Sequence, residues 1–257
     1  MDTEQTMTKR GMTVFQMKII ACITMFLDHL GAVVLRPYTD YNLETMGYKM
    51  MRILDTSYEI CRSIGRMAFP IFCFMLVEGF FHTSNRVKHL IRLAVFAVIA
   101  DPVFDYAFDG VWFCWEDQSV MVTMTIGFVM LMGMDAIHRK LAPSLVHDFL
   151  LTLTVAAACG LAYFAKCDYS YKGILAIAAI WLIYPLLNVN RFAFSLSTGA
   201  FFAWEWFGKV SRVPASLSPL LFLFYNGQRG RSAKYFFYVF YPAHLLFLAW
   251  LLRVLLY

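Results

Sequence analysis

The chain consists of a series of apolar stretches, most of which approach the ~20 residues that a helix needs to cross the hydrocarbon core of a bilayer. Of its 257 residues, 60% are hydrophobic and only 15% are charged, against about 25% charged residues in ordinary soluble domains. A soluble core of this length could not bury so much apolar surface, whereas lipid accepts it. The stretches lie at 14–36, 59–81, 88–108, 119–137, 148–165, 172–188, 192–209, 215–225 and 236–256.

This pattern predicts an all-α, polytopic integral membrane helical bundle with about nine transmembrane helices. Residues 1–13 are expected to form a cytoplasmic N-terminal tail and residues 14–257 a single transmembrane domain, because no internal repeat or linker interrupts them. The eighth stretch is short, which favours a half-helix or a re-entrant segment. Residues 37–58 form the longest predicted loop, whose Met, Tyr and Leu spacing suits an interfacial helix on the outer leaflet.

The basic residues set the predicted orientation. When nine spans are threaded, five groups of lysine and arginine fall on one side, and the positive-inside rule makes that side cytoplasmic. The opposite loop at 109–118 is acidic and aromatic. The net charge of +5 comes from these loops, and no basic run is long enough to indicate nucleic-acid binding. The six cysteines are spaced irregularly, mostly within apolar runs, which predicts small core residues rather than a metal site.

Ionisable residues within the predicted spans are functional hypotheses by default, because a charge in the bilayer centre costs a few kcal/mol. The first set lies in the outer half of the bundle. An imidazole there suits general base catalysis, with a carboxylate to fix its tautomer. The structural alternative is that the arginine pairs with an aspartate to hold helices together while the histidine bonds a backbone carbonyl. The five predicted catalytic residues are His29, Asp28, Asp101, Asp105 and Arg66.

A second set lies near the predicted cytoplasmic surface. Arginine recognises phosphate oxygens well, and glycines beside it allow a backbone to approach closely. Positive-inside anchoring is the alternative explanation for such cations. The residues assigned to binding a phosphorylated donor, or to lining its path, are Glu78, His82, Arg86, Asn226, Arg229, Arg231, Tyr241 and His244.

Several segments resemble the TraX family of conjugal-transfer proteins, named for the F-pilin acetylase. They include FQMKIIACITMFLDHLGAVV at 15–34, IGRMAFPIFCFMLVEGFFHTSN at 64–85 and RLAVFAVIADPVFDYAF at 92–108. The segments LFYNGQRG at 223–230 and KYFFYVFYPAHLLFL at 234–248 extend the likeness to the C-terminus. The chain is also distantly similar to transmembrane acyltransferases such as heparan N-acetyltransferase and bacterial carbohydrate O-acyltransferases. In those families a membrane-embedded histidine is the key catalytic group, and the comparable position here is His29.

The resemblance implies an acetyltransferase in the bacterial cytoplasmic membrane, with acetyl-coenzyme A as the cytoplasmic donor and no metal. The acceptor would be reached from the outer face: a pilin-like N-terminus, another peptide or amine, or a glycan. His29 would act as a base in direct transfer or carry the acetyl group transiently. An oligomer is compatible with this arrangement. The rival hypothesis is a secondary transporter or proton-coupled exporter that uses the same buried Asp, His and Arg residues, and a third is a non-catalytic membrane scaffold.

Overall fold

The computed structural model describes residues 11–205, 213–232 and 234–257, and helices make up most of them. No β-strand occurs within these residues, so the predicted all-α class is confirmed for the described part of the chain. Residues 1–10 of the predicted tail lie outside it, as do residues 206–209 at the end of the seventh apolar stretch.

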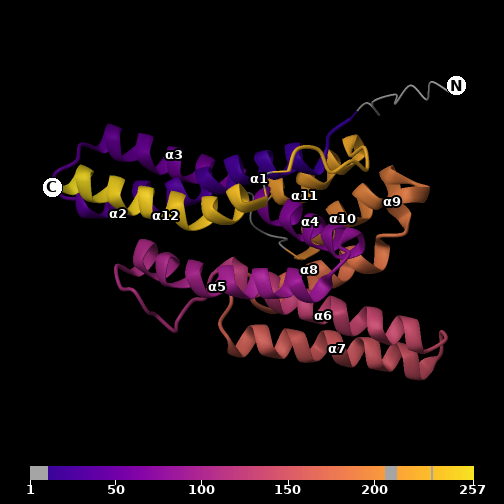
Figure 1. Ribbon diagram of the computed structural model, residues 1–257. Coiled ribbons are helices and arrows are strands. Elements are labelled where there is room, and N and C mark those ends of the chain that lie inside the picture. The colour runs from indigo at the N-terminus through magenta and orange to yellow at the C-terminus, as the bar shows by residue number, and fades with distance from the viewer. Residues whose placement is uncertain (1–10, 206–212, 233) are drawn as a thin grey trace, which may run out of the picture.

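The first helical segment runs along the length of the molecule (Figure 1). It comprises α1 (Val14–His29), a π-helical turn (Leu30–Leu35) and α2 (Arg36–Tyr41). Thr13 is the N-cap of α1 and forms a capping box with Gln16. The Thr13 hydroxyl accepts a hydrogen bond from the Gln16 backbone N–H, and the Gln16 side-chain oxygen accepts one from the Thr13 N–H. The last helix, α12 (Lys234–Leu256), lies beside α1 and runs in the same direction.

The second helical segment begins earlier in the chain than the sequence predicts. Residues 37–58 were predicted as a loop whose spacing suits an interfacial helix, but α2 extends into this region to Tyr41. The helix α3 (Tyr48–Gly65) fills its second half, continues past residue 58 and leads, through a turn at 66–67, into α4 (Ala68–His82). The helix α3 packs along α1 and the π-helical turn. Its charged and apolar residues lie on opposite faces, so a segment with many charged side chains still forms a helix by packing its apolar face on its neighbours.

Two glycines allow α3 to approach the first segment closely. A Cβ atom on Gly65 would lie 2.3 Å from the Asp28 Cβ, and one on Gly31 would lie 3.2 Å from the Cys61 Cβ. Small residues at helix crossings bring backbones together in membrane proteins, because packing rather than the hydrophobic effect drives association there. These contacts hold Asp28 and His29 against α3.

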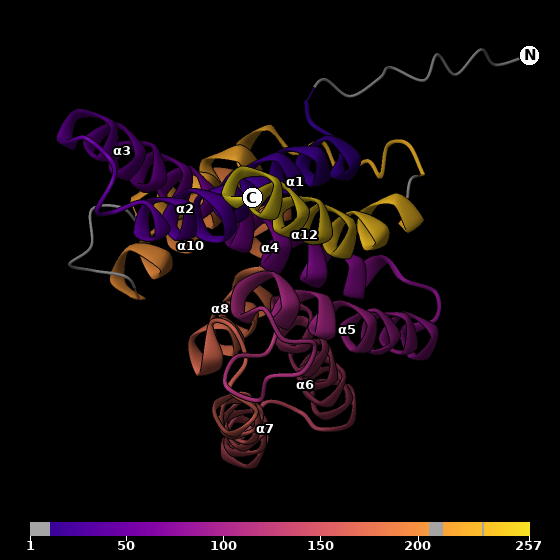
Figure 2. The same ribbon diagram turned by 90° about the vertical axis from the view of Figure 1, so that its left-hand side faces the viewer.

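The next four helices stack away from α1 (Figure 2). They are α5 (Arg86–Asp109), α6 (Val120–Lys140), α7 (Leu145–Phe164) and α8 (Ser170–Ile183). Successive members pack as hairpins, α5 on α6, α6 on α7 and α7 on α8, and α8 also contacts α4. In Figure 2, α7 lies farthest from α1.

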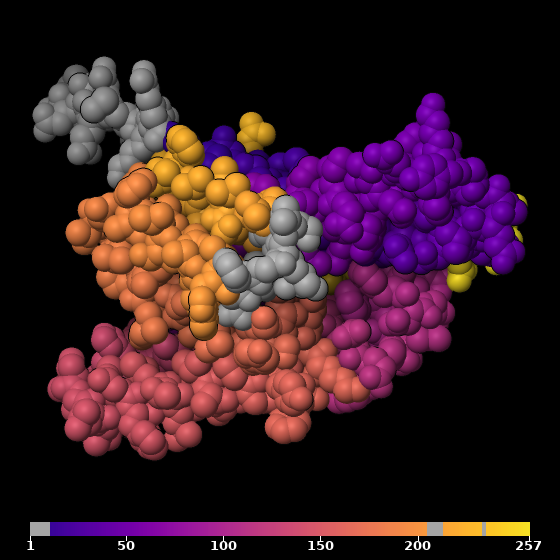
Figure 3. Space-filling view, turned by 180° about the vertical axis from the view of Figure 1, so that it is seen from behind, coloured from indigo at the N-terminus to yellow at the C-terminus, as the bar shows by residue number. Residues whose placement is uncertain are grey.

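The remaining helices cover α4 and α8 and are seen from behind in Figure 3. They are α9 (Leu186–Val189), α10 (Arg191–Glu205) and α11 (Val213–Leu217), followed by a 3-10 helix (Ser218–Phe224). The eighth apolar stretch was predicted as a half-helix or re-entrant segment. It forms the short α11 and the 3-10 helix, so it is too short to cross a bilayer as one regular helix.

Five helical segments in the described part of the chain are long and apolar enough to cross a membrane: Val14–Tyr41, Tyr48–His82, Val120–Lys140, Leu145–Phe164 and Tyr235–Leu256. Large apolar side chains are exposed along them, with Leu145 at 89% and Phe164 at 78%. Such surfaces suit contact with lipid and point to a membrane protein. The predicted total of nine crossings is not reached by these five segments and stays a prediction.

The close contact at Gly65 leads to a test. We expect Gly65→Ala to lower the stability of the purified protein by about 1–3 kcal/mol, because the added methyl group would overlap Asp28 and push α3 from α1. Thermal unfolding in detergent measures the change. Gly47→Ala is the matched control, because no atom lies within 4 Å of the position its Cβ would take. Equal midpoints for Gly65→Ala and Gly47→Ala would contradict the close-packing account.

Candidate functional site

His29 lies at the point where the first segment changes its helical geometry. The regular helix α1 ends at His29, and the π-helical turn begins at Leu30. A π-helical turn displaces one residue from the usual hydrogen-bond ladder, and such turns are frequent at functional sites. The His29 side chain is 8% exposed, so the turn places an imidazole inside the bundle.

The partner of His29 is a second histidine, His244 of α12. The His29 Nδ1 lies 2.6 Å from the His244 Nε2. The two rings are nearly coplanar, at 3°, with centroids 4.9 Å apart. With the two nitrogens so close and the centroids so far apart, the rings must meet edge to edge. The shared proton therefore lies in the plane of both rings, where a hydrogen bond is strongest.

The backbone of α12 fixes the direction of this hydrogen bond. The His244 Nδ1 lies 2.7 Å from the Phe240 carbonyl oxygen, which can only accept, so this nitrogen carries a proton. In a neutral His244 ring the Nε2 is then an acceptor, and the His29 Nδ1 must donate to it. No hydrogen bond from the described residues engages the His29 Nε2, which is left with a free lone pair. The arrangement holds His29 in the tautomer that a general base requires.

Aromatic rings enclose the histidine pair. Tyr241 and Phe108 stand edge-on to the His29 ring, with centroid distances of 5.9 and 5.8 Å. Phe240 stacks on His244 with centroids 4.8 Å apart. Tyr241 is buried, at 5% exposure. These rings limit the access of water to the pair, which strengthens its hydrogen bond.

Asp28 forms an ion pair with a residue of α3. Its carboxylate lies 2.6 Å from Arg62 of α3, a residue outside the predicted set, whereas the sequence left open which aspartate pairs with Arg66. Arg66 instead hydrogen-bonds Tyr169, and it lies within electrostatic range of Asp28 and Asp168. Arg62 and Arg66 are four residues apart at the end of α3, a spacing that places both on one helix face. That spacing is the signal in the sequence that could have pointed to Arg62.

Asp101 and Asp105 of α5 hold a loop. The Asp101 carboxylate accepts from the Ser119 backbone N–H at 2.7 Å, and the Asp105 carboxylate accepts from that of Cys114, also at 2.7 Å. In the described part of the chain neither carboxylate bonds the His29 ring, whose hydrogen-bond partner is His244. The structure thus places these two predicted catalytic residues at the base of the 110–119 loop, where they position its backbone.

A cavity of about 430 Å³ opens beside Arg66, at the turn between α7 and α8. Asp168 lines it, and desolvation of this carboxyl raises its pKa to about 6, while nearby Arg66 opposes the rise. Three residues of the turn have left-handed backbone conformations: Lys166 (φ 50°), Tyr169 (φ 64°) and Ser170 (φ 46°). Non-glycine residues in this region are strained, and such strain often lies at functional sites.

The residues predicted for donor binding separate into groups. Tyr241 and His244 flank His29. Glu78 is buried and accepts hydrogen bonds from the Tyr184 and Tyr225 hydroxyls, and the His82 Nδ1 lies 3.2 Å from the same carboxylate. This hydrogen-bonded group joins α4 to the end of α8 and to the 3-10 helix.

Arg86 and Asn226 are also engaged within the protein. Arg86 pairs with Asp135 of α6, and its guanidinium lies 4.1 Å from the Phe80 ring centroid. The Asn226 side chain donates to the Gly11 carbonyl at 3.2 Å and accepts from the Gln228 N–H at 2.9 Å, which fixes the turn before α12. Arg229 and Arg231 are exposed and form no ion pair within the described residues. They remain the members of the set whose charge is not neutralised.

Comparison with known proteins extends over nearly the whole chain. A probable fimbrial assembly protein, FimC of serogroup H1, from Dichelobacter nodosus is 29% identical over 252 residues, covering 90% of this chain and 92% of that protein. No solved structure matches the chain. The TraX protein family matches residues 14–253, a range that includes His29, His244 and both arginines of the 229–231 turn. The chain therefore belongs to the TraX family.

Proposed function

We propose that this protein is a membrane-embedded acetyltransferase in which His29 removes the proton from an amine or hydroxyl acceptor. The observation that carries the proposal is the hydrogen-bond series from His29 through His244 to the Phe240 carbonyl, which leaves a lone pair on the His29 Nε2. A buried neutral imidazole with a fixed tautomer is suited to general base catalysis. The family likeness supports acyl transfer as the chemistry.

In the proposed step, the acceptor nitrogen or oxygen attacks the thioester carbonyl of acetyl-coenzyme A. A bond forms between the acceptor and the acetyl carbon, and the carbon–sulfur bond breaks. The His29 Nε2 takes the acceptor proton and returns it to the departing sulfur, so that the histidine ends neutral. The His244 ring accepts the hydrogen bond from His29 throughout and stabilises the positive charge that develops on His29.

The two ends of the bundle suit different substrates. The first turn of α1 lies at the end that carries Arg229 and Arg231, where we place the cytoplasm and the donor, as expected for a protein of the bacterial cytoplasmic membrane with its N-terminus inside. We place the acceptor in the cavity beside Arg66 at the other end of α8. The name of the Dichelobacter relative and the family both favour a pilin-like N-terminus as acceptor.

Asp28 and Arg62 have a supporting role in this proposal. Their ion pair, with side-chain exposures of 15% and 21%, fixes the residue that precedes His29 to the neighbouring helix. Asp101 and Asp105 shape the acceptor side through the 110–119 loop. The remaining predicted catalytic residue, Arg66, lines the cavity and is placed to contact an acceptor.

The central test is His29→Ala in purified full-length protein, assayed with radiolabelled acetyl-coenzyme A and a peptide carrying a pilin-like N-terminus. We expect transfer to fall by roughly 100- to 10 000-fold, the usual contribution of a general base. His138→Ala is the matched control, because this exposed histidine at the end of α6 contacts His147 and Trp181 instead. Undiminished acetyl transfer by His29→Ala would show that His29 is not the general base.

The role of His244 predicts a difference between two substitutions. In His244→Gln, the side-chain oxygen of the glutamine can accept the hydrogen bond that the His29 Nδ1–H donates. In His244→Leu there is no acceptor, so the buried His29 N–H is left unpaired. We expect His244→Gln to retain most of the kcat and His244→Leu to lose about tenfold or more. If both variants lost kcat equally, His244 would contribute packing and no hydrogen bond.

Ligand-induced stabilisation separates an acyltransferase from a transporter of small solutes. We expect coenzyme A to raise the unfolding temperature of the detergent-solubilised protein, since a ligand that binds only the native state stabilises it. Adenosine is the control ligand, because it lacks the phosphates and the pantetheine arm. No shift at millimolar coenzyme A would favour the transporter hypothesis.

A further inference from the structure

Cations gather where α1, α5 and the 226–231 turn meet. A small cavity, about 30 Å³, is lined by Lys18, Arg229, Arg231 and Ser232 and by the rings of Phe15 and Phe237. Its size admits phosphate oxygens rather than a whole nucleotide. Lys18 is half-buried in the second turn of α1, its Nζ 5.4 Å from the Phe237 ring centroid.

The backbone of the turn fixes the two arginines to the start of α1. The Val14 N–H donates to the Gln228 carbonyl at 2.9 Å, and the Phe15 N–H donates to that of Arg229 at 3.1 Å. Gly230 has φ +70°, and a Cβ there would lie 2.6 Å from the Thr13 Oγ1. These bonds occupy the first N–H groups of α1, so an anion would be bound by the side chains, with the positive end of the helix dipole adding to them.

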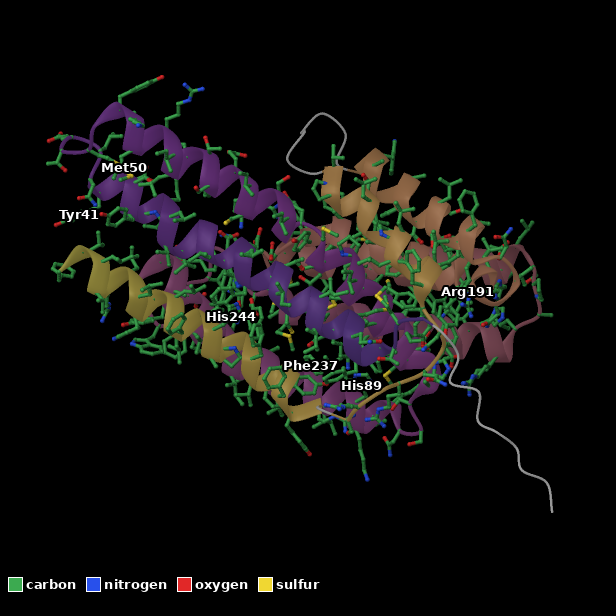
Figure 4. The ribbon with its side chains drawn as sticks, turned by 90° about the horizontal axis from the view of Figure 1, so that it is seen from above. Tyr41, Met50, His89, Arg191, Phe237 and His244 are labelled. Atoms are coloured by element: carbon green, nitrogen blue, oxygen red, sulfur yellow. The ribbon has the colours of Figure 1, made fainter. Side chains whose placement is uncertain are left out.

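Two residues of α5 extend the positive region. His89 lies within electrostatic range of both Arg92 and Lys18. The side chain of Arg92 hydrogen-bonds Tyr238, yet its Nε is buried with no hydrogen-bond partner among the described residues. Figure 4 shows His89 and Phe237 toward the same end of the bundle, with His244 farther along α12. The region thus includes charge carried inside the bundle as well as on the exposed turn.

Anchoring by the positive-inside rule does not account for this arrangement. Within the described ranges, Lys18, Arg92, Arg229 and Arg231 form no ion pair, whereas Arg86 and Arg139, at the same end of the bundle, both pair with Asp135. Surface anchors project into water, but Lys18 and the Arg92 Nε are withdrawn from it. Like charges held together and partly desolvated repel one another unless an anion lies between them.

We propose that Lys18, Arg92, Arg229 and Arg231 form a binding site for the phosphate groups of the acyl donor. This inference rests on the proposed function and adds to it two residues from within helices, Lys18 and Arg92, while leaving Arg86 to its ion pair. Lysine and arginine are the side chains that best bind phosphate oxygens. An anionic lipid headgroup carries the same chemistry and is the other source that the experiment must separate.

The distance between Lys18 and His29 along α1 favours the acyl donor, rather than a lipid, as the source of the bound phosphate groups. Lys18 and His29 lie on one uninterrupted helix, and at 1.5 Å per residue the rise between them is about 16 Å. The pantetheine arm that separates the phosphates of coenzyme A from its sulfur spans ~15–20 Å when extended. Phosphates held at Lys18 therefore suit a thioester at the depth of His29.

The experiment measures binding by purified full-length His29→Ala protein in nanodiscs of zwitterionic lipid, so that turnover plays no part. The probes are coenzyme A, 3′-dephospho-coenzyme A and pantetheine. We expect coenzyme A to bind most tightly, dephospho-coenzyme A more weakly and pantetheine at least a hundredfold more weakly. Lys18→Met, and separately the double variant Arg229→Gln and Arg231→Gln, should each weaken coenzyme A binding at least tenfold. Lys88→Gln removes an exposed charge outside the cavity and should change affinity less than twofold.

The outcomes separate this site from the proposed function. Coenzyme A affinity unchanged in both Lys18→Met and the double variant would overturn the site, whether or not the parent protein transfers acetyl groups. If coenzyme A does not bind but phosphatidylglycerol stabilises the protein through the same residues, the phosphate site stands and the acetyl-coenzyme A donor is wrong. The double variant lies on an exposed turn, so it provides the test if Lys18→Met fails to fold. Unfolding without ligand verifies each variant.

Discussion

The hydrogen bond between His29 and His244 is the interaction on which the geometry of the candidate site depends. It joins α1 to α12, two helices separated by most of the sequence, at the position where α1 gives way to a π-helical turn. The direction of the bond is not free, because the Phe240 carbonyl accepts the remaining proton of His244. The tautomer of His29, and with it the position of its unprotonated nitrogen, is thus determined by the backbone of another helix. No carboxylate is required for this, unlike the arrangement in serine proteases.

The surrounding contacts keep the pair in place. The glycines at 31 and 65 allow α3 to lie close to the first segment, and the Asp28–Arg62 ion pair then fixes the residue next to His29. Aromatic rings from α5 and α12 close the other sides. Removing one member of a partly buried ion pair leaves the charge of the other uncompensated. Loss of Arg62 would therefore disturb Asp28 and, with it, the position of His29 beside it.

The sequence was sufficient to predict the helical class and the apolar stretches, and it singled out His29 as an ionisable residue within one of them. Each of these rests on local information: hydrophobic length, or a charge within an apolar run. It was not sufficient to pair His29 with His244, since they are 215 positions apart and no periodic pattern links residues at that separation. For the same reason His244 was grouped with the donor site, and Asp101 and Asp105 with the histidine. Their actual partners are the backbone N–H groups of Ser119 and Cys114, which the types of the side chains do not reveal.

The same limit explains the α3 region. Charged side chains recur along this helix, so a search for unbroken apolar stretches reads most of it as a loop, although its two faces differ strongly in polarity. Lys18 was overlooked because one lysine in an apolar helix is usually an interfacial residue whose side chain reaches water. Only the fold shows that a turn more than 200 residues away brings two further cations to it.

The central claim, that the His244 ring holds His29 as the Nδ1–H tautomer, can be measured directly by nitrogen-15 spectroscopy of histidine-labelled protein in bilayers. Comparison with His29→Gln and His244→Gln assigns the signals. The account predicts that both rings are neutral and carry their proton on Nδ1, with an unprotonated Nε2 on His29 and a coupling across the bond to His244. A His29 ring protonated on Nε2, or one whose signals do not change in His244→Gln, would contradict it.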